Sequence, residues 1–237
     1  MRSFFQLALG LTVLAATLGN PARAQDSAVY IVTYVELMPS EIGSGTTLLK
    51  QYRDVSRKEP GDVRFDVLHE IARPNRFAIL KVWKDKAAHD AHDLASAQIR
   101  DRLKAIEDAP DDQRIDNPLY TTPEKSPAQT ATLYVVTHVD VIPPGKDACM
   151  TALKAMSSDT AKDPGNIAYQ VLVQDGRSNH FTVVEAWSSK AALDAHAMAA
   201  HTRSFREKLS PLAGALYDER FYRALDLTRD HLCGAKT

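Results

Sequence analysis

The chain has 237 residues, of which 44% are hydrophobic and 25% are charged, and its 29 basic residues almost balance its 30 acidic ones. This composition is typical of an ordinary soluble globular protein, and it excludes a disordered tail, a collagen-like fibre and a protein with several membrane spans. Because there is no surplus of basic side chains to neutralise phosphates, nucleic acid is not expected as a partner.

Residues 1–24 have the three-part layout of a secretory signal peptide. Arg2 precedes a short apolar run that ends at Leu18, and residues 22–24 form a small-x-small cleavage sequence. An uncleaved membrane anchor would need an apolar span of about 20 residues. We therefore expect an exported protein, periplasmic or secreted, with no membrane attachment after cleavage.

Residues 28–120 predict six elements in the order strand, helix, strand, strand, helix, strand. Alternating runs rich in β-branched residues indicate the strands, and Pro-containing turns separate them from amphipathic stretches. Asp85 precedes an Ala-rich stretch and predicts a helix N-cap. The expected elements are a strand at 30–38, a helix at 42–58, a hairpin of strands 63–70 and 76–83 around the turn 72–75, an Ala-rich helix after Asp85 with a further helical stretch, and a last strand around 114–120.

The second half of the chain repeats the first with a constant shift of 104 positions. Tyr30–Pro39 returns as Tyr134–Pro143, and Trp83–His92 returns as Trp187–His196. Gapless matches of this kind do not arise by chance, so residues 131–226 form a second module. Its expected elements are strands at 133–142, 167–174, 180–187 and 216–224, a helix at 146–162 and another after Ser189. A linker rich in Pro, Ser and Thr occupies residues 121–130, and residues 227–237 form a tail.

The βαββαβ order of each copy predicts an α+β fold of the ferredoxin-like kind, with helices on one face of a four-stranded sheet. The other face also needs cover, because the first strand carries large apolar side chains on both of its sides. These are Ile31, Val35 and Leu37 on one side and Tyr30, Val32 and Tyr34 on the other. The tethered second module is the expected cover. We expect a barrel-like internal pseudo-dimer, with a further homo-oligomer left open.

An oxidising compartment would permit a disulfide between the two cysteines. Cys149 shares one side of a predicted helix with Leu153 and Met156, so we expect it to face a core, whereas Cys233 lies in the tail. Either the two form a bridge, or Cys149 is a small buried hydrophobe beside a free tail thiol. The sequence leaves both alternatives open.

The repeated string Trp-x-x-Lys-Ala-Ala-x-Asp-Ala-His, at 83–92 and 187–196, follows a strand, a Pro-Gly turn and a hairpin. This combination resembles the antibiotic biosynthesis monooxygenase family of the dimeric α/β-barrel superfamily, over nearly all of both modules. The resemblance implies two modules packed sheet to sheet as an intramolecular dimeric α/β barrel, with a pocket between the sheet and the helices of each module. It is less specific for the reaction, since the family includes cofactor-independent oxygenases of quinols, haem-degrading enzymes and proteins of unknown activity.

A quinol that loses a proton becomes electron-rich enough to pass an electron directly to dioxygen. The protein then needs to supply only a base, hydrogen bonds and a dry pocket. The sequence contains no GxGxxG, P-loop, HExxH or cluster of Cys and His ligands, and no cofactor is expected. We therefore expect a cofactor-independent monooxygenase whose partners are dioxygen and a small electron-rich substrate.

The candidate catalytic residues are three histidines. His92 and His196 occupy the same position in the two modules, and a neutral imidazole is well suited to proton transfer near neutral pH. The alternative is that both are structural and pack the helix on the sheet. His201 follows His196 by five residues, which is about 140° around an ideal helix. This spacing does not predict a metal site.

The candidate substrate-binding residues are aromatic or polar groups on strands. Trp83 and Trp187 occupy equivalent strand ends, where they either line a pocket or fill the core. Comparison of equivalent strand positions in the two modules adds further candidates. At these positions one module carries a histidine or a tyrosine and the other module carries a different side chain. The full set is Trp83, Trp187, Tyr34, His138, Tyr169 and His69.

Two other functions remain open. The same fold could hold a hydrophobic metabolite, or act as a scaffold, without catalysis. Haem binding would require an axial histidine on the later helix, and the positions around Arg206 offer none.

Overall fold

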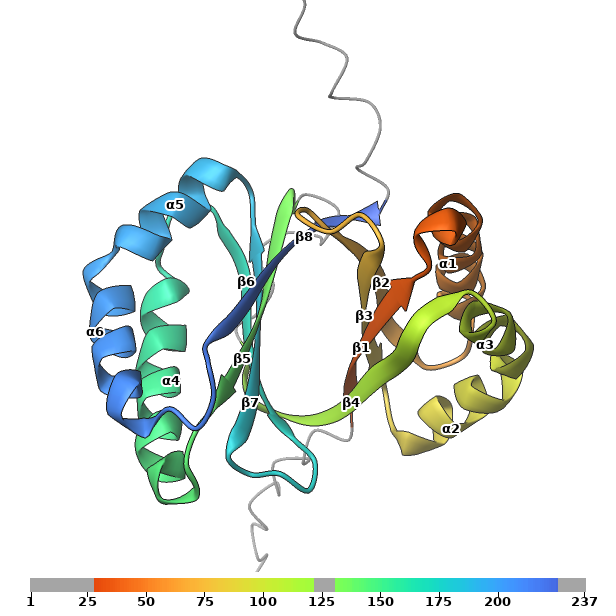
Figure 1. Ribbon diagram of the computed structural model, residues 1–237. Helices are drawn as coiled ribbons and strands as arrows, with labels where there is room; N and C mark the ends of the chain where they lie inside the picture. The colour runs from red at the N-terminus through yellow and green to blue at the C-terminus, as the bar shows by residue number, and fades with distance from the viewer. Residues whose placement is uncertain (1–27, 122–130, 226–237) are drawn as a thin grey trace, which may run out of the picture.

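The computed structural model describes residues 28–121 and 131–225. The first module has the expected element order (Figure 1). Its elements are β1 (Val29–Leu37), a 3₁₀ turn (Pro39–Glu41), α1 (Ile42–Ser56), β2 (Asp62–Glu70), β3 (Arg76–Trp83), α2 (Lys86–Ala95), α3 (Ala97–Lys104) and β4 (Glu107–Thr121).

The second module repeats this order. Its elements are β5 (Leu133–Asp140), a 3₁₀ turn (Pro143–Gly145), α4 (Lys146–Thr160), β6 (Asn166–Gln174), β7 (His180–Trp187), α5 (Lys190–Met198), α6 (Ala200–Leu209), a 3₁₀ turn (Ser210–Leu212) and β8 (Asp218–Ala224).

The helix starts follow from local chemistry. The side chain of Asp85 accepts a hydrogen bond from the backbone N–H of Ala88, and that of Ser189 accepts one from Ala192. Both residues are therefore the N-caps that the sequence predicts.

Gly165, in the turn before β6, has a φ of 81°, and a Cβ there would lie 2.5 Å from the Cβ of Ala192. Only glycine fits both this backbone conformation and the close approach of α5.

The last strand of the first module, β4, begins earlier than the sequence predicts, at residue 107 instead of near 114. Its first residues are polar and show no strand alternation. They pair with the end of β1 through register shifts, as in the pairs Glu36 with Ala109 and Leu37 with Glu107. Backbone pairing with a neighbouring strand therefore decides the structure here, because strand formation depends strongly on tertiary context.

The eight strands of the described residues close into one barrel in the order β1-β3-β2-β8-β5-β7-β6-β4. The last strand of each module reaches the other module, since β4 pairs with β6 and β8 pairs with β2. Figure 1 shows the two sheets facing each other, with the helices of each module on the outer side. The predicted fold class, an α+β intramolecular dimeric α/β barrel, is confirmed.

Three apolar cores hold this arrangement together. One fills the barrel and one lies between sheet and helices in each module, while a fourth, smaller cluster packs Trp187 with Leu133 and Val135. Strand β1 serves two of them, because Ile31, Val35 and Leu37 face the helices while Val32 faces the barrel, with Tyr30 and Tyr34 packed beside it. Each large apolar side chain removed from water in this way contributes about 1.5–3 kcal/mol. The expectation that the first strand is covered on both faces is confirmed.

Cys149 is fully buried in the core beneath α4, as expected. Cys233, with which Cys149 could form a disulfide, lies outside the described residues. The predicted signal peptide lies outside them as well, so the disulfide and the signal peptide both stay predictions.

Within residues 28–121 and 131–225, no helix combines the length and apolar character needed to cross a membrane.

Candidate functional site

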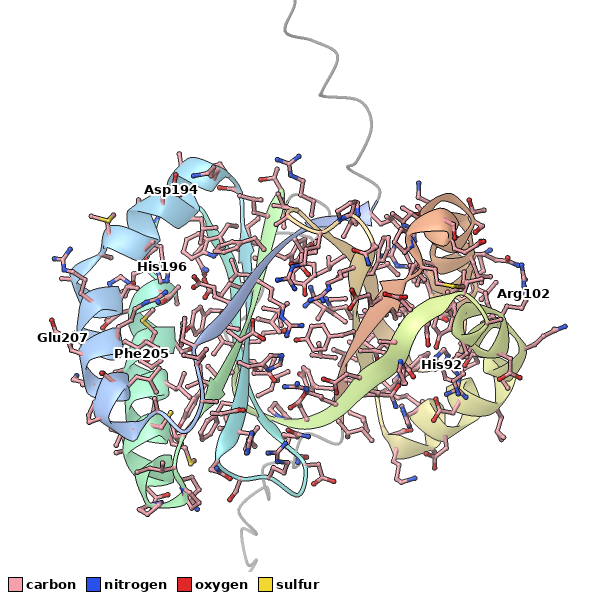
Figure 2. All side chains as sticks on the ribbon, viewed as in Figure 1. His92, Arg102, Asp194, His196, Phe205 and Glu207 are labelled. Carbon is pink, nitrogen blue, oxygen red and sulfur yellow. The ribbon has the colours of Figure 1, made fainter. Side chains whose placement is uncertain are left out.

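Each module places a tryptophan and a histidine together between its sheet and its helices. Trp83 ends β3 and His92 lies on α2, with ring centres 4.5 Å apart. Trp187 ends β7 and His196 lies on α5, with ring centres 4.8 Å apart. Figure 2 shows the two histidines on opposite flanks of the barrel.

In the first module, both ring nitrogens of the histidine have hydrogen-bond partners within the protein. His92 Nδ1 lies 2.9 Å from Glu59 Oε2, and its Nε2 lies 2.9 Å from the hydroxyl of Tyr52. These contacts fit a neutral ring that donates to the carboxylate and accepts from the phenol. The side chain is fully buried, and burial lowers the pKa of His92 to about 3. No ring nitrogen of His92 is left for a ligand, so its geometry is that of a structural residue.

In the second module, the described residues offer the histidine a hydrogen-bond partner at one ring nitrogen, Nδ1. His196 Nδ1 lies 2.7 Å from Asp163 Oδ2. Met156 stands where the first module has Tyr52, so the phenol that meets Nε2 of His92 has no counterpart at this position, and a carboxylate oxygen of Glu185 lies 3.9 Å from Nε2 of His196. Burial lowers the pKa of His196, although the carboxylate of Asp163 opposes this shift. The two histidines thus share a position in the sequence but differ in what their Nε2 atoms can do.

A buried ionisable residue lies next to each tryptophan, and it is acidic in the second module but basic in the first. Glu185 accepts a hydrogen bond of 2.8 Å from Trp187 Nε1, and burial raises its pKa to about 7. The equivalent residue Lys81 donates to Gln113 Oε1 at 2.9 Å, and burial lowers its pKa to about 8. Because a lysine cannot accept a hydrogen bond, Trp83 Nε1 finds no partner among the described residues.

Tyr169, a predicted substrate-binding residue, lies beside this group. It is paired across the sheet with Glu185, on the same helix-facing side, and is 2% exposed. Burial, and then the nearby charge of Glu185, raise the pKa of Tyr169 well above its usual value. The structure therefore brings Tyr169, Trp187 and His196 together, as the sequence analysis expects.

His201 also lies beside this group. Its five-residue spacing from His196 does not predict this, because the helix between them is interrupted. Helix α5 ends at Met198, Ala199 adopts an extended conformation, and α6 starts a new helix at residue 200. His201 Nε2 consequently lies 3.1 Å from the same Asp163 Oδ2 that His196 contacts. The inference from an uninterrupted helix, that His196 and His201 point apart, is wrong.

The donor atoms of Asp163, His196 and His201 all lie within 4.8 Å of one another. Two imidazole nitrogens and a carboxylate oxygen form a set that can hold a metal ion. This is the only such group found within the described ranges.

A cavity of about 190 Å³ opens between the C-terminal end of β5, α6 and the segment that leads to β8, and Trp187, His196 and Asp163 are not among its lining residues. Arg206 on its wall lies 4.3 Å above the ring of Tyr217 and 3.1 Å from Glu219 Oε1. The charge of Arg206 also acts on Glu185 and His196. The cavity is lined by His138, Val139, Asp140, Arg206, Leu209, Ser210, Ala213, Ala215, Leu216 and Tyr217.

Sequence reasoning missed Arg206, Tyr217 and Glu185. For Glu185 a signal was present, since it is a charged residue inside the apolar strand run 183–187 and replaces Lys81 of the first module. Arg206 and Tyr217 carry no such signal, because a single arginine on an amphipathic helix is common on protein surfaces.

Two predicted substrate-binding residues, Tyr34 and His138, do not meet the tryptophans. They hydrogen-bond to each other inside the barrel, with 2.6 Å between the Tyr34 hydroxyl and His138 Nε2. Arg114 Nη1 lies 2.9 Å from the other ring nitrogen of His138. Alternation along the strands turns these side chains away from the helices. The side chains of Tyr34 and His138 therefore do not lie with Trp83 and Trp187, although His138 borders the cavity, and their role in substrate binding stays a prediction.

His69 is also remote from the tryptophan of its module. Its ring stacks on Phe77 at 4.8 Å, and its Nε2 lies 2.8 Å from the carbonyl oxygen of Pro74. Phe77 and Trp83 are six residues apart on β3, which corresponds to about 20 Å along a strand. His69 thus braces the hairpin turn instead of lining a pocket with Trp83.

The barrel also contains a buried acid without a partner. Asp116 on β4 is 2% exposed, and neither of its carboxylate oxygens has a hydrogen-bond partner among the described residues. Burial raises its pKa to about 7, although Arg114 acts in the opposite direction. In the second module Tyr222 occupies the corresponding register position, opposite Tyr134.

Comparison with known proteins places this chain in a family. The model of the antibiotic biosynthesis monooxygenase family matches residues 29–101 and 132–208, more than half of the chain. The chain therefore belongs to this family and carries two copies of its domain. No curated protein matches the sequence.

Solved structures share the two-module barrel. A proposed monooxygenase from Fusobacterium nucleatum has a TM-score of 0.76, with 14% identity over 84% of this chain and 93% of that chain. A proposed monooxygenase from Lactobacillus acidophilus has a TM-score of 0.70, with 14% identity over 84% and 94%. An anthrone oxidase-like protein has a TM-score of 0.65, with 14% identity over 84% and 92%. At this level of identity the similarity concerns the fold.

Proposed function

We propose that the protein is a cofactor-independent monooxygenase that oxidises a small electron-rich phenol with dioxygen, in the second module. The observation that carries this proposal is the difference between the two equivalent histidines. His92 has both ring nitrogens bonded within the protein, whereas His196 is held at Nδ1 by Asp163 and has no hydrogen-bond partner at Nε2 among the described residues. A buried imidazole oriented through one nitrogen is the arrangement that a general base requires.

In this reaction His196 Nε2 takes the proton of a substrate hydroxyl. The phenolate then passes one electron to dioxygen, the two radicals combine, and loss of water leaves an oxygen atom on the ring. For a hydroquinone the balance is hydroquinone plus dioxygen giving hydroxyquinone plus water, so the substrate itself supplies all the electrons. The buried surroundings of His196 support such a step, because charges interact more strongly away from bulk water.

The cavity beside Arg206 and Tyr217 suits the developing phenolate. The guanidinium of Arg206 lines the cavity and its charge also acts on His196, so it can stabilise a negative charge that develops between the two. The volume of about 190 Å³ is smaller than the roughly 300–1,000 Å³ of typical ligand pockets. We therefore assign a single-ring phenol, such as a hydroquinone or catechol, as the substrate class.

Oxygen uptake with a panel of single-ring hydroquinones and catechols tests the proposal. Replacing the base in His196→Gln is expected to lower the rate by a factor of about 10²–10⁴. The matched control is His92→Gln, the same substitution at the equivalent position, which is expected to retain most of the activity. Labelled dioxygen should place one oxygen atom in the product, which distinguishes a monooxygenase from an oxidase that forms peroxide.

Two results would refute the proposal. One is a wild-type protein that leaves the spontaneous oxygen uptake of every substrate unchanged, which would favour a binding or scaffold protein of the same fold. The other is an equal loss of activity in His196→Gln and His92→Gln at matched stability.

We also propose that the protein acts after export. The support is the charged start, apolar middle and small-x-small end of residues 1–24.

A further inference from the structure

The group formed by Asp163, His196 and His201 has a geometry that the proposed reaction does not need. Base catalysis requires one carboxylate behind His196, yet the same Asp163 oxygen also faces Nε2 of His201. His201 lies on a different helix and reaches this point only because the chain breaks at Ala199. Three metal-ligating side chains therefore converge from three separate elements of the second module.

The separations of the donor atoms resemble those around a metal ion. Zinc binds imidazole nitrogen and carboxylate oxygen at about 2.0–2.2 Å, so neighbouring ligand atoms lie about 3–3.5 Å apart. Asp163 Oδ2 is 2.7 Å from His196 Nδ1 and 3.1 Å from His201 Nε2, and all three atoms fit within 4.8 Å. Binding of all three atoms to one ion requires an imidazole to rotate so that the two nitrogens approach this spacing.

The backbone holds the carboxylate in place. Asp163 lies in the turn after α4, where its N–H donates to the carbonyl of Thr160 and its carbonyl accepts from the N–H of Asn166. Its neighbour in the chain, Pro164, restricts the turn further. The site also has a route to solvent, because the side chains of Asp163 and His201 are 18% and 19% exposed.

The first module shows what the group looks like without a third ligand. Glu59 and His92 reproduce the carboxylate and the first histidine, but Ala97 occupies the position of His201. A carboxylate and one histidine are thus enough to anchor the helix on the sheet. The additional histidine of the second module needs a separate reason.

We propose that Asp163, His196 and His201 form a binding site for one divalent transition-metal ion of the zinc type. Two imidazoles and one carboxylate suit Zn²⁺, Co²⁺ and related ions better than Mg²⁺ or Ca²⁺. Such an ion occupies Nδ1 of His196 and leaves the ring proton on Nε2. Metal binding and the role of His196 as a base therefore exclude each other, but the site itself exists whether or not the protein is an oxygenase.

The test is titration of the untagged full-length chain with Co²⁺, followed by visible absorption, with Zn²⁺ as competitor. The expected result is one Co²⁺ per chain, with the absorption of a low-coordinate nitrogen and oxygen site that Zn²⁺ removes. His201→Ala should weaken Co²⁺ binding at least about 100-fold, the upper end of the effect seen when even a supporting group of a metal site is lost. Because His201 is partly exposed, this variant should fold, which circular dichroism checks.

The matched control is His180→Ala. His180 forms a similar pair with Asp140, with 2.8 Å between Nδ1 and Oδ1, but no third metal-ligating group joins it among the described residues. Its loss should leave Co²⁺ binding unchanged. If His201→Ala does not fold, Asp163→Asn, which keeps the shape of the side chain, replaces it. Absence of the Co²⁺ spectrum in the wild type, or equal binding by the His201 and His180 variants, would overturn the proposal.

Discussion

Asp116 is the buried group whose replacement has the clearest expected effect. Its carboxyl lies inside the barrel with no hydrogen-bond partner among the described residues, and burial raises its pKa from 3.8 to about 7. The folded protein therefore keeps a proton that the unfolded chain releases between pH 4 and 7. The contribution of Asp116 to stability is fully present below about pH 4 and is lost as the pH rises to about 7.

The magnitude follows from the size of the shift. A difference of about three pKa units corresponds to about 4 kcal/mol between pH 4 and pH 8. Asp116→Asn keeps the size and the polarity but cannot ionise. The variant should match the wild type near pH 4 and exceed its free energy of unfolding by up to about 4 kcal/mol at pH 8. For a chain of this length, that equals roughly 8–16 °C in Tm.

Denaturant unfolding followed by circular dichroism at pH 4, 6 and 8 measures this difference. Asp218→Asn is the control of opposite sign, because the ion pair with Arg220 outweighs partial burial and lowers the pKa of Asp218. That variant should lose stability above pH 4. If Asp116→Asn is less stable than the wild type at pH 8, then Asp116 has a charge-stabilising partner and the reasoning fails.

Two further predictions concern the second module and the N-terminus. Met156→Tyr copies Tyr52 of the first module, and its hydroxyl should hydrogen-bond to Nε2 of His196. We therefore expect loss of oxygen uptake with the fold retained. An active variant would show that Nε2 is not the proton acceptor. Export should remove residues 1–24, so intact-mass measurement of the mature protein should give a chain that begins at Gln25; retention of Met1 or Arg2 in the exported protein would contradict it.

The proposed site shows how far sequence reasoning reaches. The repeat places His92 and His196, with their tryptophans, at equivalent positions, and the structure does bring each pair together. It does not reveal that Tyr52 bonds one histidine while Met156 leaves the other open, because those residues lie on another helix, about 40 positions away. Two copies with the same string can thus differ in chemistry through distant neighbours.

The sequence by itself determined the two-module organisation, the order of elements and the double burial of the first strand. These features depend on local spacing, such as the alternation of Ile31 and Val32 and the N-caps Asp85 and Ser189. Period and capping are properties of neighbouring residues, so they can be read along one chain.

Only the tertiary structure decided which residues meet. It closed the barrel through β4 and β8, turned Tyr34 and His138 into the barrel and away from the helices, and brought His201 to Asp163 across a break at Ala199. Each outcome depends on strand register or on a helix interruption. A shift of one residue reverses the face of a strand, and one extended residue redirects a helix, so contacts between distant elements do not follow from local pattern.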